Sequence, residues 1–378
     1  MQEKVKKRMA LSAIFFLNGL IFSTFASRIP SIKALFQLNE AELGTLLLVL
    51  SIGSIIGIPV SGWLVEKHES RKSILLGGLC LGTFILLLGY WPTLFIFGCG
   101  LFLFSFSLRL LNIGMNTQGI TLQRVYGKNI NGSLQGSWSL GGIAGVGLST
   151  LLVWLDVRMT LHFTIVGLLG IVSFLFLGQW LLRGDHAPSM QKMKFGKPDP
   201  YILSLGMLVI LAGICEGGMF DWSGVYFKEV VHVELFTLGY LTFMIAMAAS
   251  RFASDLMIDA IGMKRMFIFS SLTMVLGFTI AISFPKFWPV LIGFMLVGLG
   301  TAAFFPMIFT LAGKSVKYSA GMAISMVGTY STLGFLTGPT LIGYIAHVFS
   351  LRTSFLFFCL AALVMIPVSR FVFRKYNL

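Results

Sequence analysis

Four ionisable residues lie inside long apolar stretches of the chain. They are Arg109, Glu216, Asp221 and Arg251. If these stretches cross a bilayer, each charge is costly unless it faces protein or a water-filled cavity. Such residues therefore indicate where a membrane protein would bind polar or charged groups within the bilayer.

Arg109 begins a polar stripe on one predicted helix. Asn112 and Asn116 follow it at i+3 and i+7, which places the three side chains on one helix face. We interpret this face as the lining of a solute path, with Arg109 donating hydrogen bonds to a hydroxyl, carboxylate or phosphate group. Asn18, Glu216 and Trp222 are assigned to the same path. The alternative is that the stripe only locks helices together.

Glu216 lies deep in the seventh apolar stretch, beside two glycines. The protonation of a buried carboxyl group depends on its partner, which is what proton coupling requires. We therefore interpret Glu216 as a candidate for proton coupling. Asp221, which lies on the same stretch, is a second candidate. The alternatives for Glu216 are a permanent ion pair with Arg109 or a neutral acid bonded to the backbone.

Two further charged sets are predicted to act at the membrane surfaces. Arg28 and Asp221 lie half a chain length apart near the predicted outer surface, and we expect them to pair as an outer gate; the alternative is two independent interfacial residues. Arg251 and Asp255 are spaced to pair on one helix face. The expected latch of the inner loops comprises Gly62, Glu66, Lys67, Arg71, Arg251, Asp255, Asp259 and Arg265.

The composition predicts that membrane helices carry these residues. Of 378 residues, 56% are hydrophobic and 11% are charged, whereas soluble domains carry roughly 25% charged residues. This excludes a water-soluble fold, and at about 20 residues per crossing the chain has room for about twelve spans. The apolar stretches lie at 9–27, 42–65, 73–90, 94–118, 133–154, 160–182, 201–226, 236–256, 266–284, 288–312, 321–346 and 353–373.

The two halves of the chain look duplicated. Gly141 and Gly145 in the fifth stretch are spaced like Gly334 and Gly338 in the eleventh. We therefore expect an all-α membrane protein with twelve transmembrane helices in two pseudo-symmetric six-helix bundles, at 1–182 and 200–378, joined by a cytoplasmic linker at 183–199. The segments on the same side of the membrane as the N-terminus hold twenty Lys and Arg residues, and the segments on the opposite side hold six. The positive-inside rule therefore favours both termini in the cytoplasm, in a cell or inner membrane.

Several motifs resemble those of one transporter family. The turn GWLVEKHESRK at 62–72 resembles the loop signature of the major facilitator superfamily. The stretches LNIGMNTQG, GSWSLGG and CEGGMFDWSGVYF, which begin at Leu111, Gly136 and Cys215, resemble a bacterial branch related to the fucose permeases. The resemblance implies that helices 1, 4, 7 and 10 line a central cavity and that transport proceeds by alternating access. Relatives of this branch carry sugars.

The sequence thus predicts a monomeric secondary active transporter of a small polar solute such as a sugar, a symporter driven by a proton or another coupling ion. It shows no phosphate-binding GxxxxGKS loop and no HExxH pair, so we expect no enzyme activity, cofactor or metal. The net charge of +14 sits in short turns and not in one patch, so we expect no nucleic-acid partner. Two alternatives remain, namely a proton-driven exporter of amphipathic compounds with a Phe- and Met-rich pocket, and a non-transporting receptor or scaffold.

Overall fold

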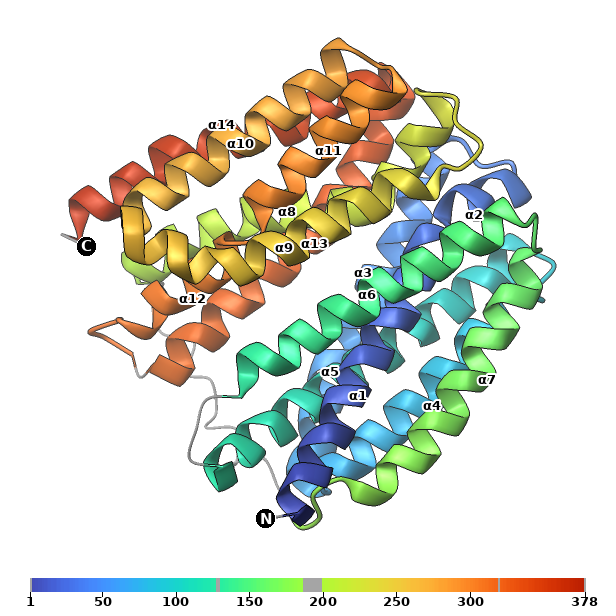
Figure 1. Ribbon diagram of the computed structural model, residues 1–378, viewed down its shortest axis with the longest axis vertical. Helices are drawn as coiled ribbons and strands as arrows, with labels where there is room; N and C mark the ends of the chain where they lie inside the picture. Colours follow the sequence, from blue (N-terminus) through green and yellow to red (C-terminus); the bar gives the residue numbers. More distant parts are fainter. Residues whose placement is uncertain (1, 127–129, 186–198, 319, 377–378) are drawn as a thin grey trace. The chain divides into compact units, whose positions relative to one another are not determined.

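A computed structural model describes residues 2–126, 130–185, 199–318 and 320–376, apart from the side chains of residues 2, 252, 255, 320 and 321. Within these ranges the chain forms fourteen α-helices and one short 3-10 helix, without strands (Figure 1). A helix satisfies its backbone hydrogen bonds within one segment, which apolar stretches in lipid require. The all-helical fold predicted from the composition is confirmed.

The helices form two units, each described here by itself. Unit 1 comprises Met1–Ile32 and Val49–Met193. In it α1 packs along α6, and α4 lies beside both α5 and α7 (Figure 1). Its elements are α1 (Gln2–Ser27), the second part of α3 (Glu40–Lys67), α4 (Ser70–Leu88), α5 (Leu94–Tyr126), α6 (Asn131–Trp154), α7 (Met159–Leu177) and η1 (Gly178–Trp180).

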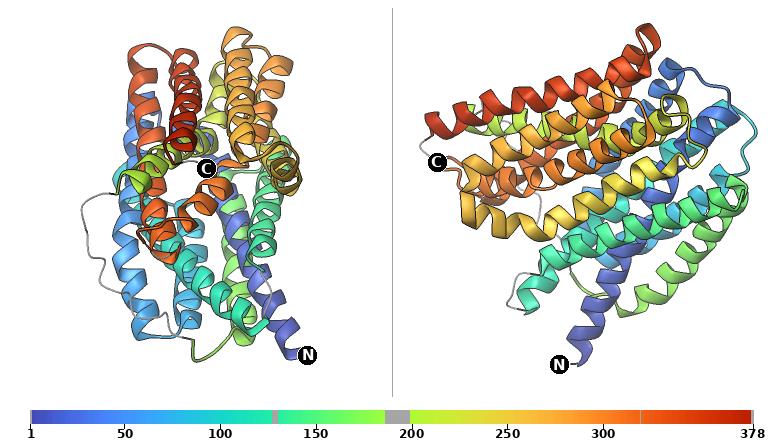
Figure 2. Two further views of the ribbon diagram at one scale, coloured as in Figure 1. Left: turned by 90° about the vertical axis from the view of Figure 1, so that its left-hand side faces the viewer. Right: turned by 45° about the horizontal axis from the view of Figure 1, so that its top comes forward.

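Unit 2 comprises Lys194–Leu378 together with one segment from the first half of the sequence, Lys33–Leu48. That segment contains the end of α2 (Ile29–Leu35) and the start of α3. Within unit 2, α8 packs along α13, and α10 lies beside α11 and α14 (Figure 2). Its other elements are α8 (Pro200–Glu229), α9 (Thr237–Ile261), α10 (Met263–Ser283), α11 (Phe287–Thr301), α12 (Phe304–Gly313), α13 (Ala320–Val348) and α14 (Leu351–Lys375).

The duplicated glycines have the same role in each unit. A Cβ atom on Gly141 would lie 1.9 Å from the carbonyl oxygen of Phe16, so only glycine lets α6 come this close to α1. In unit 2, a Cβ atom on Gly334 would lie 2.4 Å from the carbonyl oxygen of Ile210, so a glycine also allows the close approach of α13 to α8. The repeat seen in the sequence is therefore a repeat of helix packing.

Ten helical segments in the described part of the chain are long and apolar enough to cross a membrane. α9 and α13, which contain undescribed side chains, are not among the ten. The predicted stretch 288–312 forms two helices, because α11 ends at Thr301 and α12 begins at Phe304. Pro306 explains the break, since its ring would clash with the carbonyl group of Ala302 four residues earlier.

The turn at 62–72, which resembles the loop signature, differs in backbone conformation from the turn between α9 and α10 in unit 2. Gly262 joins α9 to α10 with φ 80, a conformation that favours glycine. Glu69, at the equivalent turn before α4, is extended with φ −64. The turn before α4 therefore does not require a glycine at position 69.

Candidate functional site

The predicted polar stripe lies on α5 in unit 1, with Arg109, Asn112 and Asn116 all half-buried. Asn18 reaches it from α1, and its Nδ2 donates to Asn112 Oδ1 at 3.1 Å and to Met115 Sδ at 3.4 Å. Asn116 Nδ2 donates to the backbone oxygen of Asn112 at 2.8 Å. The structure thus brings together the three asparagines that the sequence assigned to one path.

Arg109 completes this group from the α3 side. Its Nε donates to Ser54 Oγ at 2.9 Å, and a Cβ atom on Gly57 would lie 3.0 Å from the Cβ of Arg109, so the stem of the arginine lies against α3. Ser54 was missed because a lone serine in an apolar stretch carries no spacing signal. We call this group the unit 1 polar patch: Asn18, Ser54, Arg109, Asn112 and Asn116.

One atom of the unit 1 polar patch lacks a partner. Asn18 is only 1% exposed, yet its Oδ1 accepts no hydrogen bond from any described residue. A buried carbonyl oxygen without a donor costs about 1–3 kcal/mol. A hydroxyl donor from water or from a bound solute would remove that cost.

Glu216 forms an ion pair in unit 2. Arg251 on α9 donates from Nη2 to Glu216 Oε1 on α8 at 3.3 Å. Glu216 is 4% exposed, and its Oε2 has no partner among the described residues. The predicted partner of Arg251, Asp255, has its side chain outside the described residues, so that pair stays a prediction. Sequence spacing shows partners on one helix only, which is why the pair with Glu216 was missed.

Trp222 packs between two helices of unit 2, and its place in the path lining stays a prediction. Its ring is fully buried, and its indole Nε1 donates to the carbonyl oxygen of Pro339 on α13 at 2.9 Å. An aromatic ring with its one donor satisfied is a stable component of a helix interface. In this conformation Trp222 therefore holds α8 against α13. Asp221, which precedes it, is half-buried, and its coupling role stays a prediction.

Arg28 makes its hydrogen bonds within unit 1. Its Nε donates to His162 Nδ1 at 3.2 Å, and its Nη2 donates to the carbonyl oxygen of Val157 at 3.0 Å. Burial lowers the pKa of Arg28 to about 10, which leaves it positively charged at neutral pH. The gate between Arg28 and Asp221 stays a prediction, because the two residues belong to different units.

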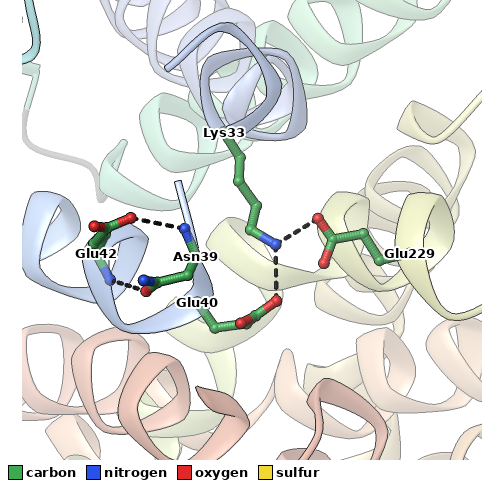
Figure 3. Close-up of polar contacts among 5 residues, drawn as sticks. All are labelled: Lys33, Asn39, Glu40, Glu42 and Glu229. Carbon is green, nitrogen blue, oxygen red and sulfur yellow. Dashed lines mark hydrogen bonds and ion pairs between the residues drawn. The ribbon is translucent and has the colours of Figure 1, made fainter. Parts of the chain in front are cut away.

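Lys33 lies at the centre of a charged cluster that the sequence did not reveal (Figure 3). Its Nζ lies 2.9 Å from Glu40 Oε1 and 2.6 Å from Glu229 Oε1, and the lysine side chain is only 9% exposed. Asn39 and Glu42 exchange two 2.9 Å hydrogen bonds between side chain and backbone, the capping box that starts α3. The cluster joins the segment Lys33–Leu48 to the end of α8.

The predicted inner latch is less complete. Arg71 donates from Nε to the carbonyl oxygen of Gly178 at 2.8 Å, and Gly62 is half-buried. Of the ion pairs seen between described side chains, only that of Arg251 involves a member of the latch. The latch as a whole stays a prediction. Four of its members are exposed to solvent: Glu66, Lys67, Asp259 and Arg265.

A second buried cluster lies where unit 1 meets the predicted linker. Gln118 Nε2 donates to Ser70 Oγ at 3.0 Å, and Ser70 Oγ donates to Asp185 Oδ2 at 2.6 Å. Asp185 is 6% exposed, and burial raises the pKa of its carboxyl group although the bond from Ser70 opposes the shift. Gln118 is thus occupied away from the stripe, and the cluster ties the start of α4 to the chain after α7.

A family model and individual related sequences both match nearly the whole chain. A model of the Major Facilitator Superfamily matches residues 11–262 and 241–377. An uncharacterized MFS-type transporter of Yersinia pestis is 32% identical over 94% of this chain and 92% of its own length. The membrane protein MosC of Rhizobium meliloti is 28% identical over 97% of this chain and 91% of its own length.

Solved structures show the same fold. The nucleoside transporter NupG, as its D323A mutant, superposes with a TM-score of 0.78 at 12% identity, covering 97% of this chain and 99% of NupG. A bacterial homolog to the human lysosomal transporter Spinster, in an inward-facing and unoccupied conformation, gives a TM-score of 0.77 at 15% identity, covering 99% of this chain and 98% of its own.

Proposed function

Because this chain belongs to the major facilitator superfamily, we propose that it is a secondary active transporter that moves a small polar solute across the membrane together with a proton. The observation that supports coupling best is the buried pair of Glu216 and Arg251. Membership makes the chain a multi-pass membrane transporter. The solute class, the coupling ion and alternating access between two six-helix bundles are parts of the proposal.

Glu216 has the surroundings that a proton-coupling residue needs. One carboxylate oxygen binds Arg251 and the other has no partner among the described residues. An ionised Glu216 attracts Arg251, whereas a protonated Glu216 is neutral and releases most of that attraction. Proton binding and the position of Arg251 on α9 are thereby linked, which is the link that a symporter uses.

The unit 1 polar patch supports a polar solute. Its asparagine amides provide donors and acceptors that match hydroxyl groups. Asn18 Oδ1 accepts no hydrogen bond from the described residues, so a solute hydroxyl could donate to it. The motifs that resemble the fucose permease branch also support a polar solute, because relatives of that branch carry sugars. A nucleoside is a second polar class to test, since NupG is a nucleoside transporter.

Alternating access in this proposal uses the Lys33 cluster as an outer lock. The segment Lys33–Leu48 belongs to the first half of the sequence but packs with unit 2, and Lys33 binds Glu229 there. With both termini cytoplasmic, as the positive-inside rule favours, this cluster lies at the outer surface. Opening to the outside would break it, together with the proposed pair of Arg28 and Asp221. The inner latch would break in the opposite state.

The test is uptake into proteoliposomes with and without an inward proton gradient, using labelled monosaccharides and nucleosides as probes. Uptake of at least one probe should rise with the gradient in the wild-type protein. Glu216→Gln should lose the gradient-driven part while it still exchanges the probe across the membrane. Glu234→Gln, which neutralises an exposed acid, is the matched control and should behave like wild type. Gradient-driven uptake that survives in Glu216→Gln would contradict coupling through this residue.

An aromatic ladder favours a second candidate function, the export of amphipathic compounds. In unit 2, Phe335 stacks on Phe220 with ring centroids 6.4 Å apart and on Phe305 with centroids 5.7 Å apart. Phe305 and Phe335 are half-buried, whereas Phe220 is buried beneath Phe335. Partly exposed stacked rings can accept flat apolar compounds. Outward movement of ethidium driven by a proton gradient, with no uptake of sugars or nucleosides, would select this function over the first.

A further inference from the structure

Arg109 is the one charged residue of the unit 1 polar patch, and the described residues use only part of its hydrogen-bonding capacity. Its Nε binds the neutral hydroxyl of Ser54. Among the described residues, no carboxylate forms an ion pair with it. Arg109 thus differs from Lys33 and Arg251, which each bind a carboxylate within unit 2.

The acids of unit 1 lie in turns or near helix ends, and none lies in the middle of a span. The spans of this unit carry acids only near their ends, at Glu3 at the start of α1 and Glu66 at the end of α3. The helices α4, α5, α6 and α7 contain neither Asp nor Glu. The guanidinium is therefore a fixed positive charge, at membrane depth, whose own unit supplies only neutral partners.

A positive charge in this position is costly unless an anion joins it. The planar guanidinium presents parallel N–H donors that match a carboxylate, and such charge-assisted pairs are roughly twice as strong as neutral hydrogen bonds. Asn112 lies one helical turn from Arg109, about 5–6 Å between Cβ atoms, and Asn18 binds that asparagine. The amides are thus placed to bind hydroxyl groups attached to the same small molecule.

We infer that the solute is a small hydroxylated carboxylic acid, of the sugar-acid type, whose carboxylate binds Arg109 and whose hydroxyl groups bind Asn18 and Asn112. This inference rests on the proposed transport function and narrows its solute class. One guanidinium balances one negative charge, which matches a carboxylate better than a phosphate ester of about −1.5 to −2 charge.

The experiment measures binding to the purified full-length protein in detergent, without transport. Matched pairs of acids and neutral analogues serve as probes: glucuronate with glucose, gluconate with sorbitol, and lactate with propane-1,2-diol, with glucose 6-phosphate added to test a phosphate. Binding is followed by the shift of the thermal unfolding midpoint and by titration calorimetry. We expect at least one acid to bind about tenfold or more tightly than its neutral partner.

Substitutions then assign the effect to Arg109. Arg109→Gln should weaken binding of that acid by about 10- to 100-fold, the usual effect of losing a charged hydrogen-bond donor, whereas its neutral partner should bind as before. Arg109→Lys should keep part of the preference. Arg124→Gln, an exposed charge on the same helix, is the matched control and should bind like wild type. Without ligand, Arg109→Gln should be at least as stable as wild type, because it removes a charge without a counterion.

Equal binding of acids and neutral analogues throughout the panel would overturn the inference, and so would tighter binding of glucose 6-phosphate than of any carboxylic acid. A large loss of stability in ligand-free Arg109→Gln would also overturn it, because Arg109 would then hold helices together instead of binding the solute. These results leave proton-coupled transport of a neutral or phosphorylated solute open to the uptake assay. Conversely, acid binding at Arg109 without gradient-driven uptake of that same labelled acid into proteoliposomes would refute the proposed function and leave the binding site established.

Discussion

At the scale of single residues, the described part of the chain separates compensated charges from uncompensated ones. Glu216 and Lys33 lie almost out of contact with solvent and each binds an opposite charge. Arg28 and Arg109 bind only neutral groups. The compensated charges can hold a conformation, because breaking a buried pair leaves a costly lone charge. The uncompensated ones are places where an anionic solute or a conformational change can act.

Asp185 gives a prediction for the pH dependence of stability. Burial raises its pKa in the folded protein, so the folded state binds more protons than the unfolded state between the ordinary pKa of about 3.9 and the raised one. Stability should therefore fall as pH rises through this window. Asp185→Asn can still accept the bond from Ser70 and should remove this part of the pH dependence.

The measurement for Asp185 is the midpoint of thermal unfolding in detergent as a function of pH. The difference between wild type and Asp185→Asn should grow in favour of the variant as pH rises and then level off. Glu234→Gln, at an exposed position, serves as the control and should follow wild type. Parallel curves for wild type and Asp185→Asn would show that the acid is not destabilised by burial.

At the scale of elements, close helix contacts set the positions of the polar residues. α6 approaches α1 through Gly141, and α13 approaches α8 through Gly334. α1 carries Asn18 and α8 carries Glu216, so each glycine contact fixes the helix that carries a candidate functional residue. Small residues at such crossings let dispersion contacts hold helices together in lipid, where the hydrophobic effect between helices is absent.

Alanine substitutions test the two glycine contacts. Gly141→Ala and Gly334→Ala each place a methyl group against a backbone carbonyl and should lower stability by about 1–3 kcal/mol. Gly147→Ala and Gly328→Ala lie on the same two helices with nothing within 4 Å of the new Cβ. These controls should be neutral or stabilising, since alanine favours a helix by up to about 1 kcal/mol over glycine. Equal unfolding midpoints for all four variants would contradict the packing described.

The Lys33 cluster predicts how firmly the segment Lys33–Leu48 is held. Leu43 is 1% exposed within this segment, so a Leu43→Cys thiol should react slowly with a membrane-impermeant maleimide. Lys33→Met removes both ion pairs and should speed the reaction by about five- to tenfold, as expected for the loss of a partly exposed charged pair. Lys286→Met, at an exposed lysine, is the control.

This labelling result needs no solute, so it tests the lock separately from transport. Rates are compared with the same protein lacking Leu43→Cys, because Cys99 is an exposed native thiol. An unchanged rate in Lys33→Met would mean that apolar packing alone seats the segment. The contact of Gly44 with Gly343 and the hydrogen bond between Thr45 and Tyr344 at 2.9 Å would then be the holding contacts.

At the scale of the whole molecule, the two halves of the sequence and the two units of the structure do not coincide. Lys33–Leu48 is encoded in the first half and packs with the second. The helix α3 therefore begins in unit 2 and ends in unit 1. A structural exchange of this kind means that neither half of the sequence alone provides all the contacts of its unit.

Splitting the chain tests this exchange. Fragments 1–190 and 191–378, co-expressed with an affinity tag on one of them, should co-purify from the membrane because the first carries the segment that packs on α8 and α13. The combination of Lys33→Met with Gly44→Val, which crowds Gly343, should reduce recovery of the untagged fragment. Recovery unaffected by the double substitution would show that other contacts hold the fragments together.

The sequence by itself determined those features that depend on one segment at a time. Hydropathy predicted membrane helices, the i, i+3, i+7 spacing placed Arg109, Asn112 and Asn116 on one face, and the glycine repeat indicated two related halves of the sequence. The loop motifs also indicated the family. These follow from periodicity and transfer free energy, which act within a helix and need no knowledge of its neighbours.

Only the tertiary structure decided which residues meet across helices. It paired Glu216 with Arg251 and Lys33 with Glu229, buried Trp222 against Pro339, and placed Ser54 beside Arg109. Such pairs depend on the rotation and axial shift of each helix, which packing against all its neighbours fixes together. Spacing along the chain contains no record of those two quantities, so it could name the costly charges but not their partners.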